Sequence, residues 1–524
     1  MSDLLRSNLI VATGTALSRL TGLLRVMVLA AVIGKAALGD LYRIGNETPN
    51  IVYELLLGGV LSATLVPLFT AFNEEDDKES TNAVITVASV ALLFITAVAL
   101  VAAPLVFGLY SVTVSGDVDA DSFRRAGTML TRIFLIQILF YGLTALASAL
   151  LNSRRRFFAA AWSPVLANVI TIAALLSLPN AGEAGWSYLE VLDNARLRLT
   201  LGFGATVGIA AMALSLVVAV RRTGFSFRPL WDLKHPAVRK LAVMSGWTLG
   251  YVVANQASVA VVRNLADPGS GDASAYFDAY TFFVLPHGLL AVSIATTFIP
   301  EMAQAVARRD RPRFVDRASL GIRLVSLLTL PAGILVFVLR RPIVGALLQH
   351  GEYTSADADI TSRALAGFAL GLCAFSVYLF VLRGFYAHHD TRTPFLINVG
   401  ENALNILLAV ILVGRYGVMG LGASFALAKA FGAVWAVVVL ANKVGAFPLR
   451  AVFFSLARIL LAGALGGEAA WIVARNLGGN VGVDGVVRFS VAGLVGLVVY
   501  VVALIAMRAP EVSAIRRRVR PGVA

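Results

Sequence analysis

Apolar stretches of about 20 residues follow one another along this chain, with short polar connections between them. As an α-helix, a run of that length matches the hydrocarbon thickness of a bilayer, and it is too long for a strand of a membrane barrel. The pattern therefore predicts an all-α polytopic membrane protein. We predict fourteen spans, at residues 9–33, 43–72, 83–110, 123–151, 157–179, 197–220, 237–264, 274–305, 318–340, 361–385, 393–414, 419–442, 451–474 and 486–507.

The chain also repeats itself six spans apart. The letters TLVP end the second span and TFIP end the eighth, and a proline followed four residues later by an asparagine occurs at Pro164 and again at Pro394. We expect two six-span lobes in parallel orientation, covering 1–222 and 223–443, and two additional helices with a basic tail in 444–524. Parallel repeats of this kind are a transporter architecture with the substrate site between the halves.

Charge supports a membrane location and an orientation. The chain has 14% charged residues and a formal net charge of +14, and most of its basic residues fall in alternate connections, whereas residues 111–122 and 264–275 contain no Lys or Arg. This is the positive-inside pattern, which needs no nucleic-acid partner and predicts that both termini are cytoplasmic. The acidic run at 73–80 and the pair Arg340–Arg341 run against it.

The strongest candidate site lies in residues 13–67, where charges interrupt two apolar runs. Charge at membrane depth is costly and usually marks a wet cavity or a partner. Arg19 and Arg25 are six residues apart, roughly 9 Å along a helix and about 120° around it, so they can line one wall. The planar guanidinium suits phosphate, which suggests an anionic substrate. The alternative is that one arginine extends to the interface while the other pairs with Asp40 or Glu54.

A second group of charges lies in later spans. Glu401 and Asn405 are one helical turn apart and form a possible cation site, and the alternative is a buried ion pair or a packing hydrogen bond. The five histidines lack the spacing of zinc ligands, and no glycine-rich phosphate loop is present, so no metal site and no cofactor are expected. The single cysteine, Cys373, excludes an intramolecular disulfide.

Several motifs, in this order, resemble those of the MurJ/MviN family of lipid II flippases. They are SRLTGLLR at 18–25, GD at 39–40, TPNIVYELLLGGVLSATLVPLF at 48–69, ALLNSRRRFFAAAWSPVLAN at 149–168, LLQHGEYTSAD at 347–357 and GFYAHHDTRTP at 384–394. The letters YELLLGG are most similar to the actinobacterial branch of that family.

The resemblance implies a fold and an activity. The fold is that of the multidrug/oligosaccharidyl-lipid/polysaccharide exporter superfamily, and the protein is a transporter and not an enzyme. It implies flipping of lipid II from the inner to the outer leaflet of the bacterial plasma membrane, by alternating access through a cationic cavity between the lobes. The implied partners are lipid II, membrane lipids and cell-wall synthesis proteins.

The family's site carries over unevenly onto this sequence. Arg19, Arg25, Asp40 and Asn50 match its pattern, and the resemblance implies that they contact the substrate. The family has an arginine where Tyr53 stands here, so Tyr53 is also placed in the candidate site. Two further departures are Val26 in place of an aspartate and Thr281 in place of an arginine. As supporting cavity charges we expect Arg132, Arg263 and Glu54.

Three other functions remain open from the residues alone. A lipid-linked oligosaccharide flippase and a cation-coupled drug antiporter would share the fold, although a drug antiporter has no evident use for the arginine pair. A membrane-embedded enzyme acting on polyprenyl phosphate would need a patterned carboxylate cluster, and the only acidic cluster, at 73–80, has no such pattern.

Overall fold

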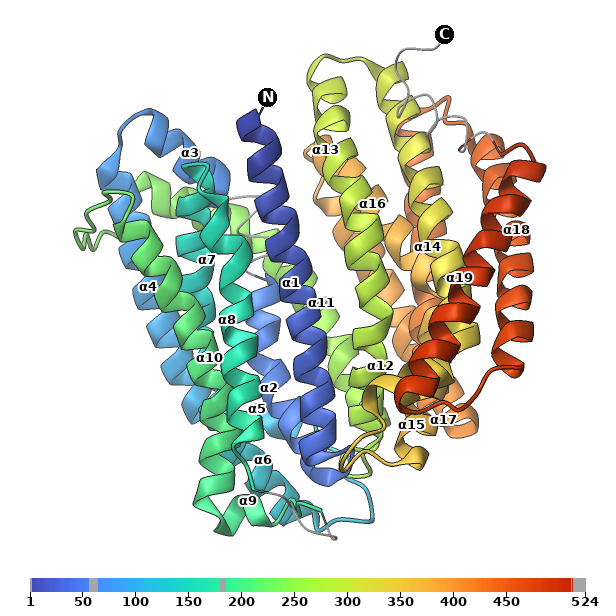
Figure 1. Cartoon of the computed structure of the whole chain (residues 1–524). Helices are drawn as coiled ribbons and strands as arrows, with labels where there is room; N and C mark the ends of the chain where they lie inside the picture. The colour runs from blue at the N-terminus through green and yellow to red at the C-terminus, as the bar shows by residue number, and fades with distance from the viewer. Residues whose placement is uncertain (1, 56–64, 180–184, 510, 512–524) are drawn as a thin grey trace. The chain divides into compact units, whose positions relative to one another are not determined.

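The computed structural model describes the backbone of residues 2–55, 65–179, 185–509 and 511, and their side chains except those of 2–12, 51–55, 240 and 242–249. Within these residues every regular element is a helix (Figure 1). The chain divides into two compact units, one made of 1–256 and 267–274, the other of 257–266 and 275–524. The predicted boundaries at 222 and 443 stay a prediction, because a compact unit need not coincide with a sequence repeat.

The first unit holds ten helices and most of an eleventh among its described residues. They are α1 (Ser2–Ile33), α2 (Ala37–Leu55), α3 (Val66–Glu74), α4 (Lys78–Val101), α5 (Ala103–Leu109), α6 (Ala120–Leu135), α7 (Gln137–Ser153), α8 (Phe157–Leu176), α9 (Glu190–Asp193), α10 (Ala195–Arg221) and α11 (Pro236–Leu265). Part of its core lies where Leu146 and Leu150 of α7 pack among Val84 of α4 and Leu216 of α10. Helix α8 packs along α1, the helix that carries Arg19 and Arg25, and so fixes the position of α1 (Figure 1).

The second unit contains the end of α11 and all later helices. They are α12 (Asp272–Pro286, from residue 275 on), the π-helix His287–Ala291, α13 (Val292–Ala307), α14 (Arg311–Leu348), α15 (Ser355–Ala369), α16 (Leu372–Ala387), α17 (Arg392–Val444), α18 (Leu449–Arg475) and α19 (Gly482–Ala506). Phe298, Phe314, Phe380 and Phe385 form part of its core. Helices α18 and α19 pack on each other and on α14, where the Tyr500 hydroxyl donates to the Leu327 carbonyl at 2.6 Å (Figure 1).

Polar residues in the connections set where several helices begin. Asp77 caps α4 by accepting from the Ser80 amide, and Thr354 and Asp357 form a reciprocal capping box at α15. At α6, hydrogen bonds from the hydroxyl and amide of Ser122 lower the pKa of the capping Asp119 carboxyl. Each cap satisfies amides that a helix leaves without an internal partner, so the apolar runs start at defined residues.

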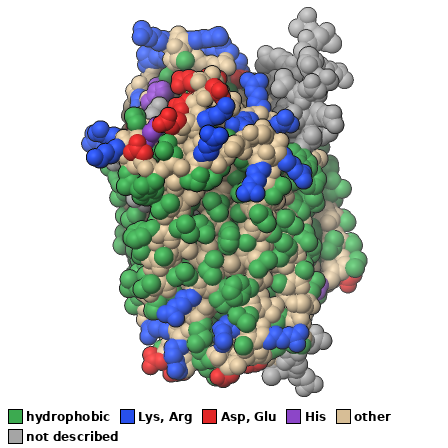
Figure 2. Space-filling model, turned by 90° about the vertical axis from the view of Figure 1, so that its left-hand side faces the viewer, with side chains coloured by type: hydrophobic (Ala, Val, Ile, Leu, Met, Phe, Trp, Pro, Cys, Tyr) green, Lys and Arg blue, Asp and Glu red, His purple; other side chains and the backbone are tan. Residues whose placement is uncertain are grey.

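The predicted all-α, multi-pass architecture is confirmed. Among the described residues ten helices are long and apolar enough to cross a membrane, or eleven if the pair α15 and α16, bent by 47°, is one span. Figure 2 shows a broad band of hydrophobic side chains between two charged ends. Leu93, Phe94 and Val98 of α4 are among the hydrophobic side chains that the protein exposes. The total of fourteen spans stays a prediction.

The boundaries of several predicted spans differ from the helices. The span at 83–110 is divided into α4 and α5, because Pro104 lacks the amide that would continue the helix. The spans at 393–414 and 419–442 are both part of α17, which breaks at Gly417 with φ 54° and ψ −138°. Only glycine adopts such a conformation without strain, so this break falls inside the predicted gap.

Candidate functional site

The helix α1 is fastened to α8 by polar contacts at one level. The Asn168 side-chain amide donates to the Ser18 carbonyl at 3.2 Å and to the Thr21 hydroxyl oxygen at 3.0 Å. One turn before Ser18, Gly14 allows close approach, since a Cβ there would lie 2.7 Å from the Trp162 ring. These contacts fix the rotation of α1 and therefore the directions of its arginines.

Arg19 and Arg25, the two arginines predicted to bind an anion, both lie on α1. Arg19 is exposed and Arg25 half-buried, and within the part of the chain that the structure describes neither forms an ion pair. The pair therefore presents two guanidinium groups at different depths along one helix, which is an arrangement suited to an anion.

The sequence also allowed Asp40 to be the ion-pair partner of Arg19 or Arg25, but the structure gives Asp40 other partners. Its carboxylate is fully buried and accepts four hydrogen bonds, from the amides of Gly269 (2.9 Å), Gly271 (3.0 Å) and Ser274 (2.7 Å) and from the Ser274 hydroxyl (2.6 Å). All these partners belong to the first unit. Asp40 therefore holds the turn before α12 and is not paired with an α1 arginine. Its predicted contact with the substrate stays a prediction.

Two cations support the same turn. The Lys35 ammonium pairs with Asp272 at 3.2 Å, and the Arg43 guanidinium donates to the Ser274 hydroxyl oxygen at 3.3 Å. Both side chains are buried, with 4% and 7% of their surface exposed. The turn at 267–274 is thus fixed to the start of α2 by one carboxylate and two cations.

We expect Asp40→Asn to loosen this turn without unfolding the unit. An amide offers one acceptor oxygen and places an NH2 group against backbone donors, and a hydrogen bond to a charged group is worth about 1.5–3 kcal/mol. Hydrogen exchange of a peptide covering 267–274 should therefore speed up at least tenfold. The exposed Asp267 provides a control in the same turn, and Asp267→Asn should leave exchange unchanged. Equal exchange in Asp40→Asn and the wild type would contradict the clamping role.

Asn50 lies in a polar network between α2 and α7. Its side-chain oxygen accepts from the Tyr141 hydroxyl at 2.5 Å and its NH2 group donates to Glu47 at 3.4 Å. One turn earlier, Asn46 accepts from Gln137 at 3.2 Å. A substrate group that contacts Asn50 would therefore compete with Tyr141. The side chains of the two other candidates on α2, Tyr53 and Glu54, lie outside the described residues.

The two supporting arginines differ in exposure. Arg132, near the end of α6, is exposed. Arg263, in the second unit, is 3% exposed and lies over the Phe277 ring, 4.6 Å from its centroid. Thr281, which stands where the family has an arginine, donates to the Phe277 carbonyl of its own helix.

The possible cation site in the second unit is filled by the chain itself. The Lys429 ammonium pairs with Glu401 at 2.7 Å and lies 4.9 Å from the Tyr378 ring centroid and 5.3 Å from that of Phe425. Asn405 donates to Ser258 at 3.0 Å and accepts from Ser424 at 3.1 Å. This arrangement favours the ion-pair alternative over a bound cation. No group of three or more metal-ligating side chains occurs among the described residues.

Sequence reasoning missed the residues that organise this site through long-range contacts. Lys35, Gln137 and Tyr141 were not singled out, and each acts on a partner 91 or 237 positions away. A polar side chain in an apolar run, as at Gln137, was the one signal available. Arg43 stood among the charges of the first two predicted spans, but its partner was not visible in the sequence.

Comparison with known proteins gives a consistent result. A family model described as "Lipid II flippase MurJ" matches residues 29–507, a range that begins after the α1 arginines. A "Lipid II flippase MurJ" of Burkholderia cenocepacia is 29% identical over 429 residues, covering 80% of each chain. A "Probable lipid II flippase MurJ" of Vibrio cholerae is 27% identical over 430 residues, covering 80% of this chain and 79% of its own.

Solved structures show the same fold. The structure named "Lipid II flippase MurJ, inward closed conformation" matches 95% of this chain and 99% of its own, with a TM-score of 0.77 and 22% identity. An inward-facing multidrug resistance MATE transporter of the MOP superfamily matches 82% of this chain and 95% of its own, with a TM-score of 0.65 and 12% identity. At such identities the two structures inform on the fold alone.

Proposed function

The chain belongs to the lipid II flippase MurJ family, and from this premise we propose that it carries lipid II from the inner to the outer leaflet of the plasma membrane. The observation that supports the proposal most is the family match over residues 29–507. The second support is Arg19 and Arg25, which lie on α1 without a carboxylate partner among the described residues. A pyrophosphate-linked sugar cannot cross hydrocarbon, whereas its polyprenyl tail can remain in lipid.

The proposed mechanism is alternating access. The head group binds the α1 arginines from one side of the membrane, and a change of conformation releases it on the other side. A bidentate guanidinium–phosphate contact gives both attraction and orientation. Membrane lipids surround the protein, and cell-wall synthesis proteins are proposed to use the flipped product.

The experiment for this function measures lipid II on the outer leaflet. Depletion of the protein in its native cells should lower the outer-leaflet lipid II and raise the inner-leaflet amount, while total lipid II stays constant or rises. Unchanged outer-leaflet lipid II would overturn the proposal. A cation-coupled drug antiporter, the alternative with the same fold, would instead change drug efflux and leave lipid II unaffected.

We further propose that both termini are cytoplasmic. Gly116, in the connection between α5 and α6, has no atom within 4 Å of an added Cβ, so a cysteine fits there without strain. In a chain with Cys373→Ala, Gly116→Cys should react with an impermeant thiol reagent added to intact cells. Glu75→Cys, an exposed site between α3 and α4, should react only after lysis. The reverse labelling pattern would invert the orientation.

A further inference from the structure

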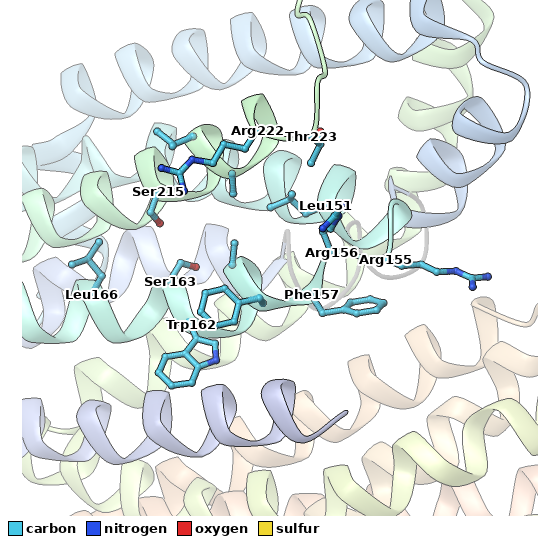
Figure 3. Close-up of a pocket in the computed structure, with 14 residues that line it drawn as sticks. Leu151, Arg155, Arg156, Phe157, Trp162, Ser163, Leu166, Ser215, Arg222 and Thr223 are labelled. Atoms are coloured by element: carbon cyan, nitrogen blue, oxygen red, sulfur yellow. The ribbon is translucent and has the colours of Figure 1, made fainter. Parts of the chain in front are cut away.

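A pocket unrelated to the α1 arginines opens in the first unit (Figure 3). It has a volume of about 590 Å³ and lies between the turn that joins α7 to α8, the first half of α8 and the C-terminal end of α10. Every residue lining it belongs to the first unit, so it is complete without any part of the second. A site of this kind suits a molecule that stays bound more than one that is carried across.

The rim of the pocket is cationic. Arg156 at the start of α8 and Arg222 at the end of α10 line it from two sides, and Arg155 extends outward from the turn (Figure 3). All three are exposed, and no carboxylate in the described parts of the chain forms an ion pair with them. The backbone amides in the first turn of α8 add positive potential, since Arg156 provides no side-chain cap. The rim therefore suits a phosphate group.

The turn that carries this rim is fixed in place. The Arg154 guanidinium donates to the Thr223 hydroxyl oxygen at 2.8 Å and lies over the Phe225 ring, 5.1 Å from its centroid. These contacts connect the end of α7 to the end of α10. The two sides of the rim are thus held together by Arg154, and Arg155, Arg156 and Arg222 take no part in this contact.

Apart from the hydroxyl groups of Ser163, Ser215 and Thr223, the rest of the pocket is lined by apolar side chains. Phe158 and Trp162 stack with ring centroids 5.5 Å apart, and Leu166 and Val218, each 40% exposed, continue the groove along α8 and α10. Aromatic side chains of this kind are typical of a membrane–water interface. A cationic rim above an apolar groove matches one amphipathic molecule with a phosphate at its end.

We propose that this pocket binds one anionic glycerophospholipid, with its phosphate at Arg156 and Arg222 and one acyl chain along Phe158, Trp162 and Leu166. Basic pockets between membrane helices bind anionic head groups in this way. Trp162 also contacts α1 at Gly14, so a lipid bound here supports the contact between α8 and the arginine-bearing helix. This lipid is a resident ligand and differs from the transported substrate.

The main test counts lipids on the full-length protein by native mass spectrometry. With equal amounts of phosphatidylglycerol and phosphatidylcholine of the same acyl chains, the wild type should retain one phosphatidylglycerol with at least tenfold preference. The variant Arg155→Gln/Arg156→Gln/Arg222→Gln should lose that preference. The matched control Arg228→Gln/Arg308→Gln/Arg309→Gln changes three exposed arginines elsewhere and should keep it. Equal retention of the two lipids by the wild type, or unchanged preference in the first variant, would overturn the proposal.

A second measurement does not depend on how the triple variant folds. Phosphatidylglycerol brominated on its acyl chains should quench wild-type tryptophan fluorescence more than brominated phosphatidylcholine does, and Trp162→Phe should abolish the difference. A difference that persists in Trp162→Phe would contradict the assignment. Undecaprenyl pyrophosphate should not displace phosphatidylglycerol at stoichiometric concentration. Displacement would assign the pocket to the substrate lipid and overturn the resident phospholipid, while leaving the proposed flippase function intact.

Discussion

Replacing Arg25 by lysine is expected to slow lipid II flipping roughly ten- to a hundredfold. Lysine keeps the charge but cannot reproduce the planar, bidentate contact with phosphate. The loss of one charge-assisted hydrogen bond is worth about 1.5–3 kcal/mol, and each 1.4 kcal/mol is a factor of about ten. Arg19→Lys should behave similarly, and alanine at either position should be worse than lysine.

The measurement is the initial rate at which lipid II becomes accessible on the outer leaflet, at matched protein levels. Arg308→Lys is a suitable control, because Arg308 is exposed in the turn between α13 and α14. Membrane insertion should be normal in all variants, since the contacts of α1 with α8 are made by Ser18, Thr21 and Asn168 and not by the two arginines. Wild-type rates in both Arg19→Lys and Arg25→Lys would contradict the phosphate-binding role.

The hydrogen bonds of Asp40 allow a second test of the role of Arg25, in a double variant. If Asp40 were the counter-ion of Arg25, neutralising both would leave no lone buried charge and should restore part of the flipping rate. Because four donors from 269–274 already bind the Asp40 carboxylate, we expect no such rescue in Arg25→Ala/Asp40→Asn. Recovery of the rate to the wild-type value would show that Arg25 serves structure and not substrate.

Local patterns in the sequence predicted the fold well, because a membrane imposes strong local constraints. A helix must be about 20 residues long and apolar, and its ends need polar caps or glycines, all of which can be read from neighbouring residues. The gap predicted between 414 and 419 contains the break at Gly417 for this reason. The Pro104 break between α4 and α5 also had a local signal, but the apolar run across it hid the signal.

The site was harder to predict, because its contacts join residues far apart in the chain. The donors to Asp40 lie 229 to 234 positions later, and three of the four are backbone amides, which no side-chain pattern reveals. Sequence reasoning therefore grouped Asp40 with nearby arginines. In contrast, Glu401 and Lys429 are both charged residues in apolar runs only 28 positions apart, so an ion pair was among the alternatives.

The second large effect is expected from Lys429→Met. This change removes the ammonium group that lies against the rings of Tyr378 and Phe425, and it leaves Glu401, which is 1% exposed, as a buried carboxylate without its cation. Breaking a buried ion pair by deleting one partner costs about 3–5 kcal/mol. We therefore expect a clear fall in the thermal unfolding temperature of the purified protein in detergent.

The double variant Lys429→Met/Glu401→Gln decides the cause of that fall. With no charge left, most of the stability should return, as expected when both partners of a buried pair are replaced. The more exposed pair of Lys443 and Asp390 is the matched control. Lys443→Met should lower the free energy of unfolding by less than about 1 kcal/mol, because both side chains of this pair are more exposed than those of Lys429 and Glu401. A double variant no more stable than Lys429→Met would mean that the methionine side chain, and not the unpaired charge, disturbs the unit.

The ion pair of Glu401 and Lys429 also predicts whether flipping depends on alkali cations. Glu401 on the first half of α17 and Lys429 on the second half are joined across the break at Gly417, and Gly432 lets the halves approach, since a Cβ there would lie 3.1 Å from Glu401 Cγ. Because Lys429 already provides the positive charge, flipping should not depend on added alkali cations, and Glu401→Gln should not change that. A sodium dependence of the wild type that Glu401→Gln abolishes would restore the cation site at Glu401 and Asn405, with Lys429 as a competitor that the ion must displace.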